Sequence, residues 1–383
     1  MQCVTNKMRS AVVLIIISLA LATIGSRSLV ERKSTRTVAS LLTETDPPPG
    51  FSYAIDPIEF EFPCDHNAHP DFRSEWWYFT GNTSTEDGHE FGFQFTIFRF
   101  ALKPSPSQSP SPWRRSNLYM GHFAISDISA GTFHSYERQS RPTLGIAGNQ
   151  GRPLKIWIAD WSLELSDEES EIWHLIAKQD GFALDIVMRA ERPILLQGDK
   201  GLSKKSAAPG NASYYYSIPR LSVNGTIDTP RDAYQVHGQG WYDHEWSTSA
   251  LAQGQQGWDW FSLQLDDGRE MMFYQIRGPD GLSAGASHGV LLSNDGTQSL
   301  LDSANVEIKV QRYWRSLQSG ARYPSQWQIK IPDQHLDFIV TPRFADQEWR
   351  ENFTYWEGAV SVTGKSTNEP ITGSGYVELV GYE

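Results

Sequence analysis

The chain has 383 residues, and its formal net charge of −12 at pH 7 corresponds to a sequence pI near 5.3. Such an acidic chain repels the phosphates of nucleic acids and anionic membrane surfaces, so we expect neither as its main partner. Hydrophobic residues make up 39% of the sequence and aromatic residues 12%, including 14 Trp. The length favours two domains, and each half contains enough apolar residues for a core.

Residues 1–25 have the pattern of a secretory signal peptide. Two basic residues precede an apolar run over residues 11–22, and this run ends in Ala-Leu-Ala. The run is short for a membrane span, which needs about 20 apolar residues, so cleavage is favoured over a membrane anchor. Residues 26–50 are polar and then Pro-rich, which indicates a flexible spacer. We therefore expect a secreted, periplasmic or cell-envelope protein, anchored to the membrane if the signal is retained.

A dense group of polar residues precedes the first predicted strand. Asp65, His66, His69 and Glu75 come directly before Trp76-Trp77-Tyr78. One interpretation is a polar rim around an aromatic pocket, able to donate or accept protons. The other is an entry loop whose side chains fix the first strand through hydrogen bonds. Asp65, His66 and His69 could offer three metal ligands, but their spacing matches no recognised site, so no metal is expected.

Alternating apolar residues then predict a series of antiparallel strands. The first two flank an Asp87-Gly88 turn, which is the strongest short-range signal of a hairpin, and residues 91–97 place four large apolar side chains on one face. Leu102–Arg115 and Gly198–Ser213 are predicted as loops. Between these loops, further strands are expected at residues 154–158, 161–165, 172–176 and 182–188.

A second dense segment, residues 236–247, combines aromatic rings with titratable groups. In a strand, Asp243 and Glu245 share one face with Trp241, and the opposite face carries Tyr242, His244 and Trp246. A carboxyl group pressed against an indole ring loses solvation, which raises its pKa and suits it to act as a general acid. The alternative is a pair of structural carboxylates bonded to Trp and backbone N–H groups inside a packed barrel.

A second aromatic hairpin begins with Trp258-Asp259-Trp260 and repeats the design of the first. Its strands, residues 258–265 and 271–277, flank an Asp267-Gly268 turn. Later strands are expected at residues 306–310, 327–331, 336–340, 355–362 and 375–382. Ser303–Gln318 is the best candidate for a helix, although it contains β-branched residues.

These elements predict an all-β protein with two antiparallel β-barrels, each closed or nearly closed, over residues 51–235 and 236–383. Closure removes exposed strand edges, and a small barrel can hold one ligand. Two β-sandwiches are the alternative. On this division only the second half places acids between Trp residues, so we expect any chemistry there, with the first barrel as a partner or pocket wall.

Several common catalytic and cofactor motifs are missing from the sequence. It contains no nucleophile elbow, phosphate loop, dinucleotide fingerprint or HExxH motif, so we do not expect a serine hydrolase. Cys3 would leave with the signal and Cys64 would then stand alone, so no intrachain disulfide is expected in the mature chain.

The same segments resemble the AttH family and the related carotenoid 1,2-hydratases, or hydroxyneurosporene synthase-like proteins. The matching stretches are residues 65–72, 74–81, 91–94, 240–248, 257–261, 355–358 and 375–379, so the resemblance covers roughly residues 51–383. It implies two lipocalin-like barrels. In one branch of the family it also implies cofactor-free addition of water to the terminal double bond of an acyclic carotenoid, and fungal phytoalexin hydratases look related. A shared fold does not fix the reaction.

The first hypothesis is therefore a cofactor-independent hydratase or isomerase that protonates a C=C bond of an isoprenoid- or carotenoid-like molecule and adds water. Asp243, Glu245 or Asp259 would donate the proton, and His244 would position the water. Aromatic faces would bind the substrate and stabilise a cation. The candidate binding residues are Trp76, Trp77, Tyr78, Trp241, Tyr242, Trp246, Trp258 and Trp260, with His66, His69 and Glu75 as a polar rim.

The second hypothesis is a non-catalytic lipocalin-type carrier of a hydrophobic ligand in the cell envelope, which needs the aromatic cavity but not the acids. A third is a structural partner of a membrane transporter, for which the sequence shows no defined surface. In the first two cases the partner is a hydrophobic small molecule. The oligomeric state stays open.

Overall fold

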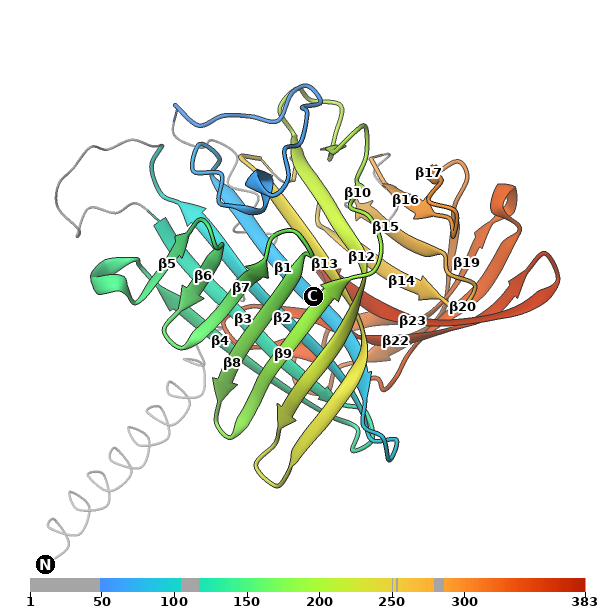
Figure 1. Ribbon diagram of the computed structural model, residues 1–383. Coiled ribbons are helices and arrows are strands. Elements are labelled where there is room, and N and C mark those ends of the chain that lie inside the picture. Colours follow the sequence, from blue (N-terminus) through green and yellow to red (C-terminus); the bar gives the residue numbers. More distant parts are fainter. Residues whose placement is uncertain (1–48, 105–116, 250, 253, 279–285, 383) are drawn as a thin grey trace, which may run out of the picture. The chain divides into compact units, whose positions relative to one another are not determined.

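The computed structural model of the protein describes residues 49–104, 117–249, 251–252, 254–278 and 286–382. The expected signal peptide, nearly all of the spacer and most of the loop over residues 102–115 lie outside these ranges. Within them the regular structure is almost entirely β-strand (Figure 1), and no helix has the length and apolar character of a membrane span. The short 3₁₀ helices are η1 (Cys64–His66), η3 (Thr143–Gly145) and η4 (Pro332–Gln334). The predicted all-β class is confirmed.

The described residues form a first sheet of thirteen strands, in the order β4-β3-β2-β1-β13-β12-β9-β8-β7-β6-β5, with β10 and β11 paired to β12. This sheet curls into a nearly closed barrel (Figure 1). The strands are β1 (Ser74–Ser84), β2 (Glu90–Ala101), β3 (Asn117–Asp127), β4 (Thr132–Ser140), β5 (Ala147–Gln150), β6 (Lys155–Ile158), β7 (Trp161–Asp167), β8 (Ile172–Gln179), β9 (Phe182–Ala190), β10 (Leu195–Leu196), β11 (Leu202–Lys204), β12 (Ala212–Asp228) and β13 (Ala233–Ser247).

A second sheet of ten strands, again counted over the described ranges, has the order β17-β16-β15-β14-β23-β22-β20-β19-β18, with β21 paired to β22. It forms a half-barrel, so it is less closed than the sequence led us to expect. The strands are β14 (Gly257–Leu265), β15 (Glu270–Arg277), β16 (His288–Leu292), β17 (Gln298–Asp302), β18 (Glu307–Arg315), β19 (Arg322–Ile331), β20 (Leu336–Pro342), β21 (Glu348–Arg350), β22 (Thr354–Ser366) and β23 (Glu369–Val380).

Both predicted hairpins form. β1 pairs with β2 and β14 pairs with β15, each antiparallel. Gly88 and Gly268 adopt positive φ values of 85° and 83° in the two turns, a conformation that glycine reaches without the steric cost of a Cβ. The Asp-Gly sequence therefore determines each turn, and each turn sets the register of the two strands that it joins.

Alternation along β2 explains how one strand serves two environments. Phe91, Phe93 and Phe95 are fully buried in the core of the first barrel. The intervening side chains point the other way, and Phe98 belongs to a separate apolar cluster that contains residues of both sheets. Successive side chains of a strand face opposite sides of the sheet, so β2 is at once a barrel wall and a surface for the second sheet.

The two sheets pack together through buried polar contacts as well as apolar ones. Glu270 of the second sheet is fully buried and forms ion pairs with two arginines of the first half, Arg220 at 2.6 Å and Arg192 at 3.2 Å. Gln264 donates to the backbone oxygens of Pro219 and Gly240, each at 2.8 Å. Buried polar groups are stable only when they are paired in this way, and the pairing fixes one sheet against the other.

Two further expectations need correction. The segment with Asp243, assigned to the second barrel, is β13, and it pairs with β1 and β12 of the first sheet. The division expected at residue 236 therefore falls inside β13, and the change of sheet lies between Ser247 and Gly257. The candidate helix Ser303–Gln318 is mostly strand β18, paired with β19, because its β-branched content and cross-strand partners outweigh its weak helical periodicity.

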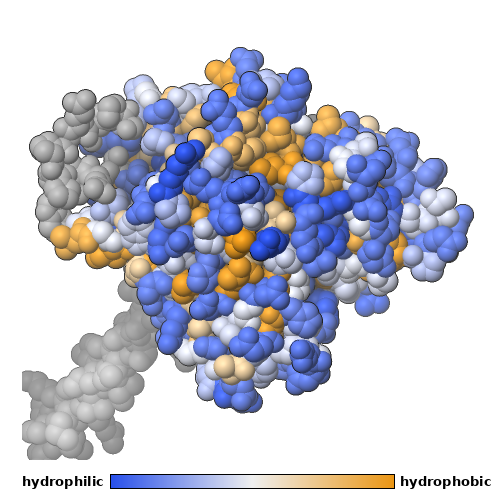
Figure 2. Space-filling model, viewed as in Figure 1, coloured by the Kyte–Doolittle hydropathy of each residue, from blue (hydrophilic) through white to orange (hydrophobic). Residues whose placement is uncertain are grey.

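Hydrophilic side chains predominate on the face shown in Figure 2, and hydrophobic ones occupy smaller areas between them. Most of the large aromatic side chains are buried instead. Trp77, Trp161, Trp173, Trp241, Trp246, Trp327, Trp349 and Trp356 are all at most 2% exposed. The aromatic content of the chain is therefore used mainly inside the sheets and between them.

Candidate functional site

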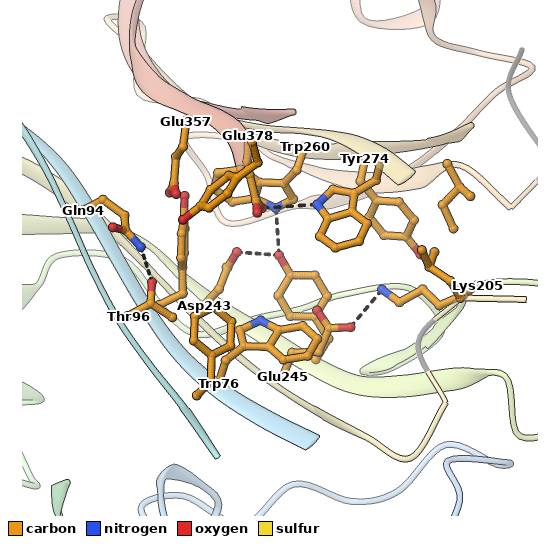
Figure 3. Close-up of a pocket in the computed structure, with 17 residues that line it drawn as sticks. Trp76, Gln94, Thr96, Lys205, Asp243, Glu245, Trp260, Tyr274, Glu357 and Glu378 are labelled. Carbon is orange, nitrogen blue, oxygen red and sulfur yellow. Dashed lines mark hydrogen bonds and ion pairs between the residues drawn. The ribbon is translucent and has the colours of Figure 1, made fainter. Parts of the chain in front are cut away.

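A cavity of about 90 Å³ lies between the two sheets and is lined largely by buried side chains (Figure 3). This volume exceeds the space of one water molecule severalfold. From the first sheet and its loops come Trp76, Tyr78, Gln94, Thr96, Phe98, Lys205, Tyr215, Asp243, Glu245 and Leu251. From the second come Trp258, Trp260, Tyr274, Ile276, Tyr355, Glu357 and Glu378. The cavity therefore exists only where the two sheets meet.

Strand register arranges the titratable groups in rows on each wall. On the first sheet, Tyr78 lies directly between Thr96 and Asp243 of the neighbouring strands. On the second sheet, Glu378 lies between Trp260 and Glu357. Side chains opposite each other on adjacent strands are in contact range. Each wall thus presents carboxyl groups beside aromatic rings to the same space.

Asp243 is held by three hydrogen-bond donors. Oδ1 accepts from the Ser217 hydroxyl at 2.5 Å and the Trp241 indole N–H at 2.7 Å, and Oδ2 accepts from the Tyr215 hydroxyl at 2.6 Å. Burial raises the pKa of Asp243 to about 7 despite these hydrogen bonds, which favour the charged form. Asp243 can therefore hold a proton near neutral pH, and the site also stabilises the anion that remains after the proton is given up.

Glu357 and Glu378 form a cross-strand pair of buried carboxyl groups on the opposite wall. Burial, with further contributions from nearby Asp243 and Glu245, raises the pKa of Glu378 to about 7, although the Trp258 indole N–H donates to it at 3.2 Å. Burial and the neighbouring Glu378 raise the pKa of Glu357 well above its usual range. Two adjacent carboxyls cannot both ionise cheaply in a buried site, so this wall retains at least one proton at pH 7.

Lys205 and Glu245 form an ion pair at the other end of the cavity, with Nζ and Oε1 2.9 Å apart (Figure 3). Burial alone would lower the pKa of Lys205, but the Glu245 carboxylate raises it. The ammonium also lies 4.3 Å from the centre of the Tyr274 ring. This pair is neutral overall, so it leaves the cavity without a free charge at that end.

His244 does not line this cavity. Its side chain lies inside the first barrel, where Nε2 is 3.0 Å from Glu75 and Nδ1 is 3.0 Å from the Tyr216 hydroxyl. His69 and Arg99 also contact Glu75, at 2.7 and 2.8 Å. Burial opposes ionisation of Glu75, but Arg99 and the two histidines hold its pKa well below the usual range. Burial lowers the pKa of His244 to about 4.

The other sequence-predicted residues divide in the same way. Trp76, Tyr78, Trp258 and Trp260 line the cavity. Trp241 does not line it, but its indole N–H donates a hydrogen bond to Asp243, which does. Inside the first barrel, with the Glu75 network, lie Trp77, Tyr242, Trp246, His66 and His69. Asp259 faces away from the cavity and is paired with Arg277 at 2.9 Å and the Tyr382 hydroxyl at 2.8 Å. The structure therefore brings Asp243 and Glu245 together at the cavity, but not His244 or Asp259.

The Glu75 network contains three atoms that could serve as metal ligands. Donor atoms of His69, Glu75 and His244 lie within 4.8 Å of one another. Both imidazoles are within hydrogen-bonding distance of Glu75 Oε1, and the Arg99 guanidinium occupies Oε2. A cation held directly on Oε2 offsets the negative charge that a metal ion would need, so these contacts are those of a hydrogen-bonded ion network.

Sequence reasoning missed several residues of the cavity. Glu357, Glu378, Lys205, Tyr215 and Gln94 were not candidate site residues, although the segments around Glu357 and Glu378 carried part of the family resemblance. The usable signal was a single acid placed between aromatic or apolar residues in each of two late strands. Their mutual position depended on the pairing of β22 with β23.

The fold and site define a β protein with one nearly closed barrel, one half-barrel, and an acid- and ring-lined cavity between the two sheets. The chain belongs to the AttH-like family, whose sequence profile matches residues 53–382. A crystal structure of a putative AttH protein from Nitrosomonas europaea is 33% identical to it, with a TM-score of 0.77, covering 87% of this chain and all of that one.

Two fungal proteins are more distantly similar. Kievitone hydratase from Fusarium solani subsp. phaseoli is 21% identical over 246 residues, which cover 62% of this chain and 68% of the relative. The crystal structure of kievitone hydratase from Nectria haematococca is 16% identical, has a TM-score of 0.66, and aligns over 87% of this chain and 97% of that one. At this identity the structural likeness shows a shared fold.

Proposed function

We propose that the protein is a cofactor-independent hydratase-like enzyme that adds water to a C=C bond of an apolar, isoprenoid-like molecule. The observation that carries the proposal is the cavity itself, in which carboxyl groups that retain protons near neutral pH face aromatic rings. The fungal relatives are named hydratases, which supports the same class of reaction. The signal-like residues 1–25 support export as part of this proposal.

Asp243 is the proposed acid. Transfer of its proton to one alkene carbon forms a C–H bond and leaves a cation on the other carbon. The resulting carboxylate is stabilised by Ser217, Trp241 and Tyr215, whose three donors are already in place. Donors arranged in advance for a charge that develops during the reaction stabilise the transition state without reorganisation.

Aromatic faces support the cation. Trp76, Trp258 and Trp260 line the same cavity as Asp243, and indole is the ring with the strongest attraction for a cation. Because bulk water would capture or deprotonate such an intermediate, a cavity of buried side chains also limits side reactions.

Glu378 is the proposed base. It lies on the wall opposite Asp243, and within the described part of the chain its one hydrogen-bond donor is the Trp258 N–H. In its ionised form it takes a proton from the attacking water as the new C–O bond forms, and the product is an alcohol. Exchange with solvent then returns a proton to Asp243 and removes one from Glu378, so no oxidant, reductant or cofactor is consumed.

A carrier function would use the same rings, but it gives no reason for four carboxyl groups and a lysine in an apolar cavity. Burying ionisable groups costs stability unless they are paired. Residues that carry such a cost are characteristic of catalytic sites. The acids are therefore the feature that favours an enzyme over a carrier.

The test is to incubate the purified protein with acyclic isoprenoid alkenes in water labelled with oxygen-18 and to search for labelled alcohols by mass spectrometry. We expect label at the hydrated carbon and a loss of about 10²–10⁴-fold in rate for Asp243→Asn. Asp337→Asn removes an acid on β20 that is far more exposed and should retain full activity. Unaltered recovery of every alkene, with the ligands bound, would favour the carrier.

A further inference from the structure

We infer that the cavity binds a molecule bearing a hydroxyl group at the end formed by Tyr78, Gln94 and Glu357, so that the substrate is an unsaturated alcohol or phenol and not a pure hydrocarbon. The inference rests on the proposed function for its reaction but concerns recognition, which is measured separately. It comes from polar atoms whose pairing among the described residues is incomplete.

Three buried side chains at this end have such atoms. Among the described residues, the Tyr78 hydroxyl, Gln94 Oε1 and Glu357 Oε1 meet no partner in good hydrogen-bond geometry, although the residues are only 7%, 2% and 2% exposed. The Tyr78 hydroxyl and the Glu357 carboxyl do interact with each other. All three line the cavity, and Figure 3 shows Gln94 and Glu357 at the same end, away from Lys205. A buried polar group without a partner costs about 1–3 kcal/mol. Gln94 Oε1, beside a Tyr78–Glu357 contact without good hydrogen-bond geometry, therefore indicates a missing polar partner.

Gln94 is constrained whichever way its amide is turned. One polar atom of the amide is 2.6 Å from the Thr96 hydroxyl on the same face of β2. If the amide were rotated so that its nitrogen and oxygen exchanged places, the oxygen would contact Thr96 and the nitrogen would lack a partner. The free atom of Gln94 is therefore a property of the site.

The opposite end of the cavity gives the contrast. Lys205 Nζ contacts Glu245 at 2.9 Å and the Ser203 hydroxyl at 2.9 Å, so its charge is matched within the protein. In the middle, Asp243 has three donors. The Tyr78 end is thus where a ligand gains most from an oxygen atom.

A hydroxyl group fits these atoms better than a charged group. It can accept a hydrogen bond from Tyr78 and donate one to Gln94 at the same time. A carboxylate or phosphate would meet Glu357 and Glu378 at close range, where like charges raise the cost of ionisation. The rings of Trp258 and Trp260 then surround the apolar part, which places the C=C bond near Asp243.

The probe pair is geraniol and its deoxy hydrocarbon analogue, which share one skeleton and differ by the hydroxyl. Titration calorimetry of the full chain should give a dissociation constant for geraniol at least about tenfold lower than that for the hydrocarbon. The hydrocarbon leaves the polar groups of the site unpaired, and this raises its dissociation constant. In Tyr78→Phe combined with Gln94→Leu, the two ligands should bind within about threefold of each other, with the hydrocarbon no weaker than before.

Ser262→Ala is the matched control. It also removes a buried hydroxyl without a hydrogen-bond partner, on β14 but outside the cavity lining, and it should leave the geraniol preference unchanged. Equal affinities of the wild-type protein for the two ligands, or no detectable binding of geraniol, would overturn the inference. A geraniol preference without any hydration product would leave it standing and would count against the proposed reaction alone.

Discussion

Asp243 and His244 are consecutive residues whose side chains lie on opposite sides of the first sheet. Asp243 faces the cavity between the sheets, and His244 lies inside the barrel, 3.0 Å from Glu75. The same division holds on the paired strand β1, where Trp76 faces the cavity and Trp77 the barrel core. The β1–β13 pair is therefore one wall with a reactive face and a structural face.

This division predicts that the two neighbours fail in different ways. His244→Gln removes the imidazole that contacts Glu75 and the Tyr216 hydroxyl, so the free energy of unfolding should fall by about 1–3 kcal/mol. The folded variant should keep the rate constant of the wild type. Asp243→Asn should instead lose activity, with a smaller change in stability. Chemical denaturation and single-turnover rates of the two variants, measured side by side, check this. Equal loss of turnover in both would contradict the separation of the two faces.

The pH dependence of activity follows from the two carboxyls with a pKa of about 7. Asp243 must be protonated to donate, so activity falls as pH rises through its pKa. Glu378 must be ionised to accept, so activity also falls as pH drops through its pKa. The product of the two populations is a narrow bell with its maximum near pH 7. In Glu378→Gln the acidic limb of any residual activity should disappear, whereas Asp337→Asn should keep the wild-type profile.

Glu378→Gln should also make the protein more stable at alkaline pH. Folding raises the pKa of this carboxyl from 4.5 to about 7, so the native state binds the extra proton and stability decreases as pH rises between these values. The glutamine variant lacks this loss and should gain roughly 1–3 kcal/mol over wild type at pH 8 but little at pH 4. Urea unfolding at both pH values measures it. A pH-independent difference between the variants would contradict the assigned pKa.

The Lys205–Glu245 pair offers a double-mutant cycle. Lys205→Met leaves Glu245 buried without its cation, and loss of one partner of a buried pair costs about 3–5 kcal/mol. Adding Glu245→Gln removes the unpaired charge and should recover most of that loss. Thermal unfolding of the single and double variants checks the coupling. Additive effects would show that the pair, at 2.9 Å, is not energetically linked.

Much of the fold was predictable because its signals are local. The Asp-Gly turns and the alternation over residues 91–97 depend on residues close together in the chain, and both hairpins form as predicted. The two faces of β13 were predictable for the same reason, since strand geometry alone places Asp243 and Glu245 opposite to His244. The half-closed second barrel and the sheet that β13 joins were not, because both depend on pairing between distant strands.

The site shows the same limit. Trp258 and Trp260 stood out in the sequence as rings beside an acid, but Asp259 between them turns to Arg277, away from the cavity. Glu357 and Glu378 carry no local sign of their raised pKa. That property arises when β22 and β23 pair and place the two carboxyls opposite each other in a buried position.

The sequence by itself determined the β-strands, their turns and which side chains share a face, because a strand's two-residue period and an Asp-Gly turn act over a few residues. Only the tertiary structure decided that the face carrying Asp243 meets the second sheet, and that Glu357 and Glu378 lie across the cavity from it. The physical reason is that the charge state of these carboxyls depends on burial and strand pairing. Both arise between distant segments, and Asp243 and Glu378 are more than a hundred residues apart in the chain.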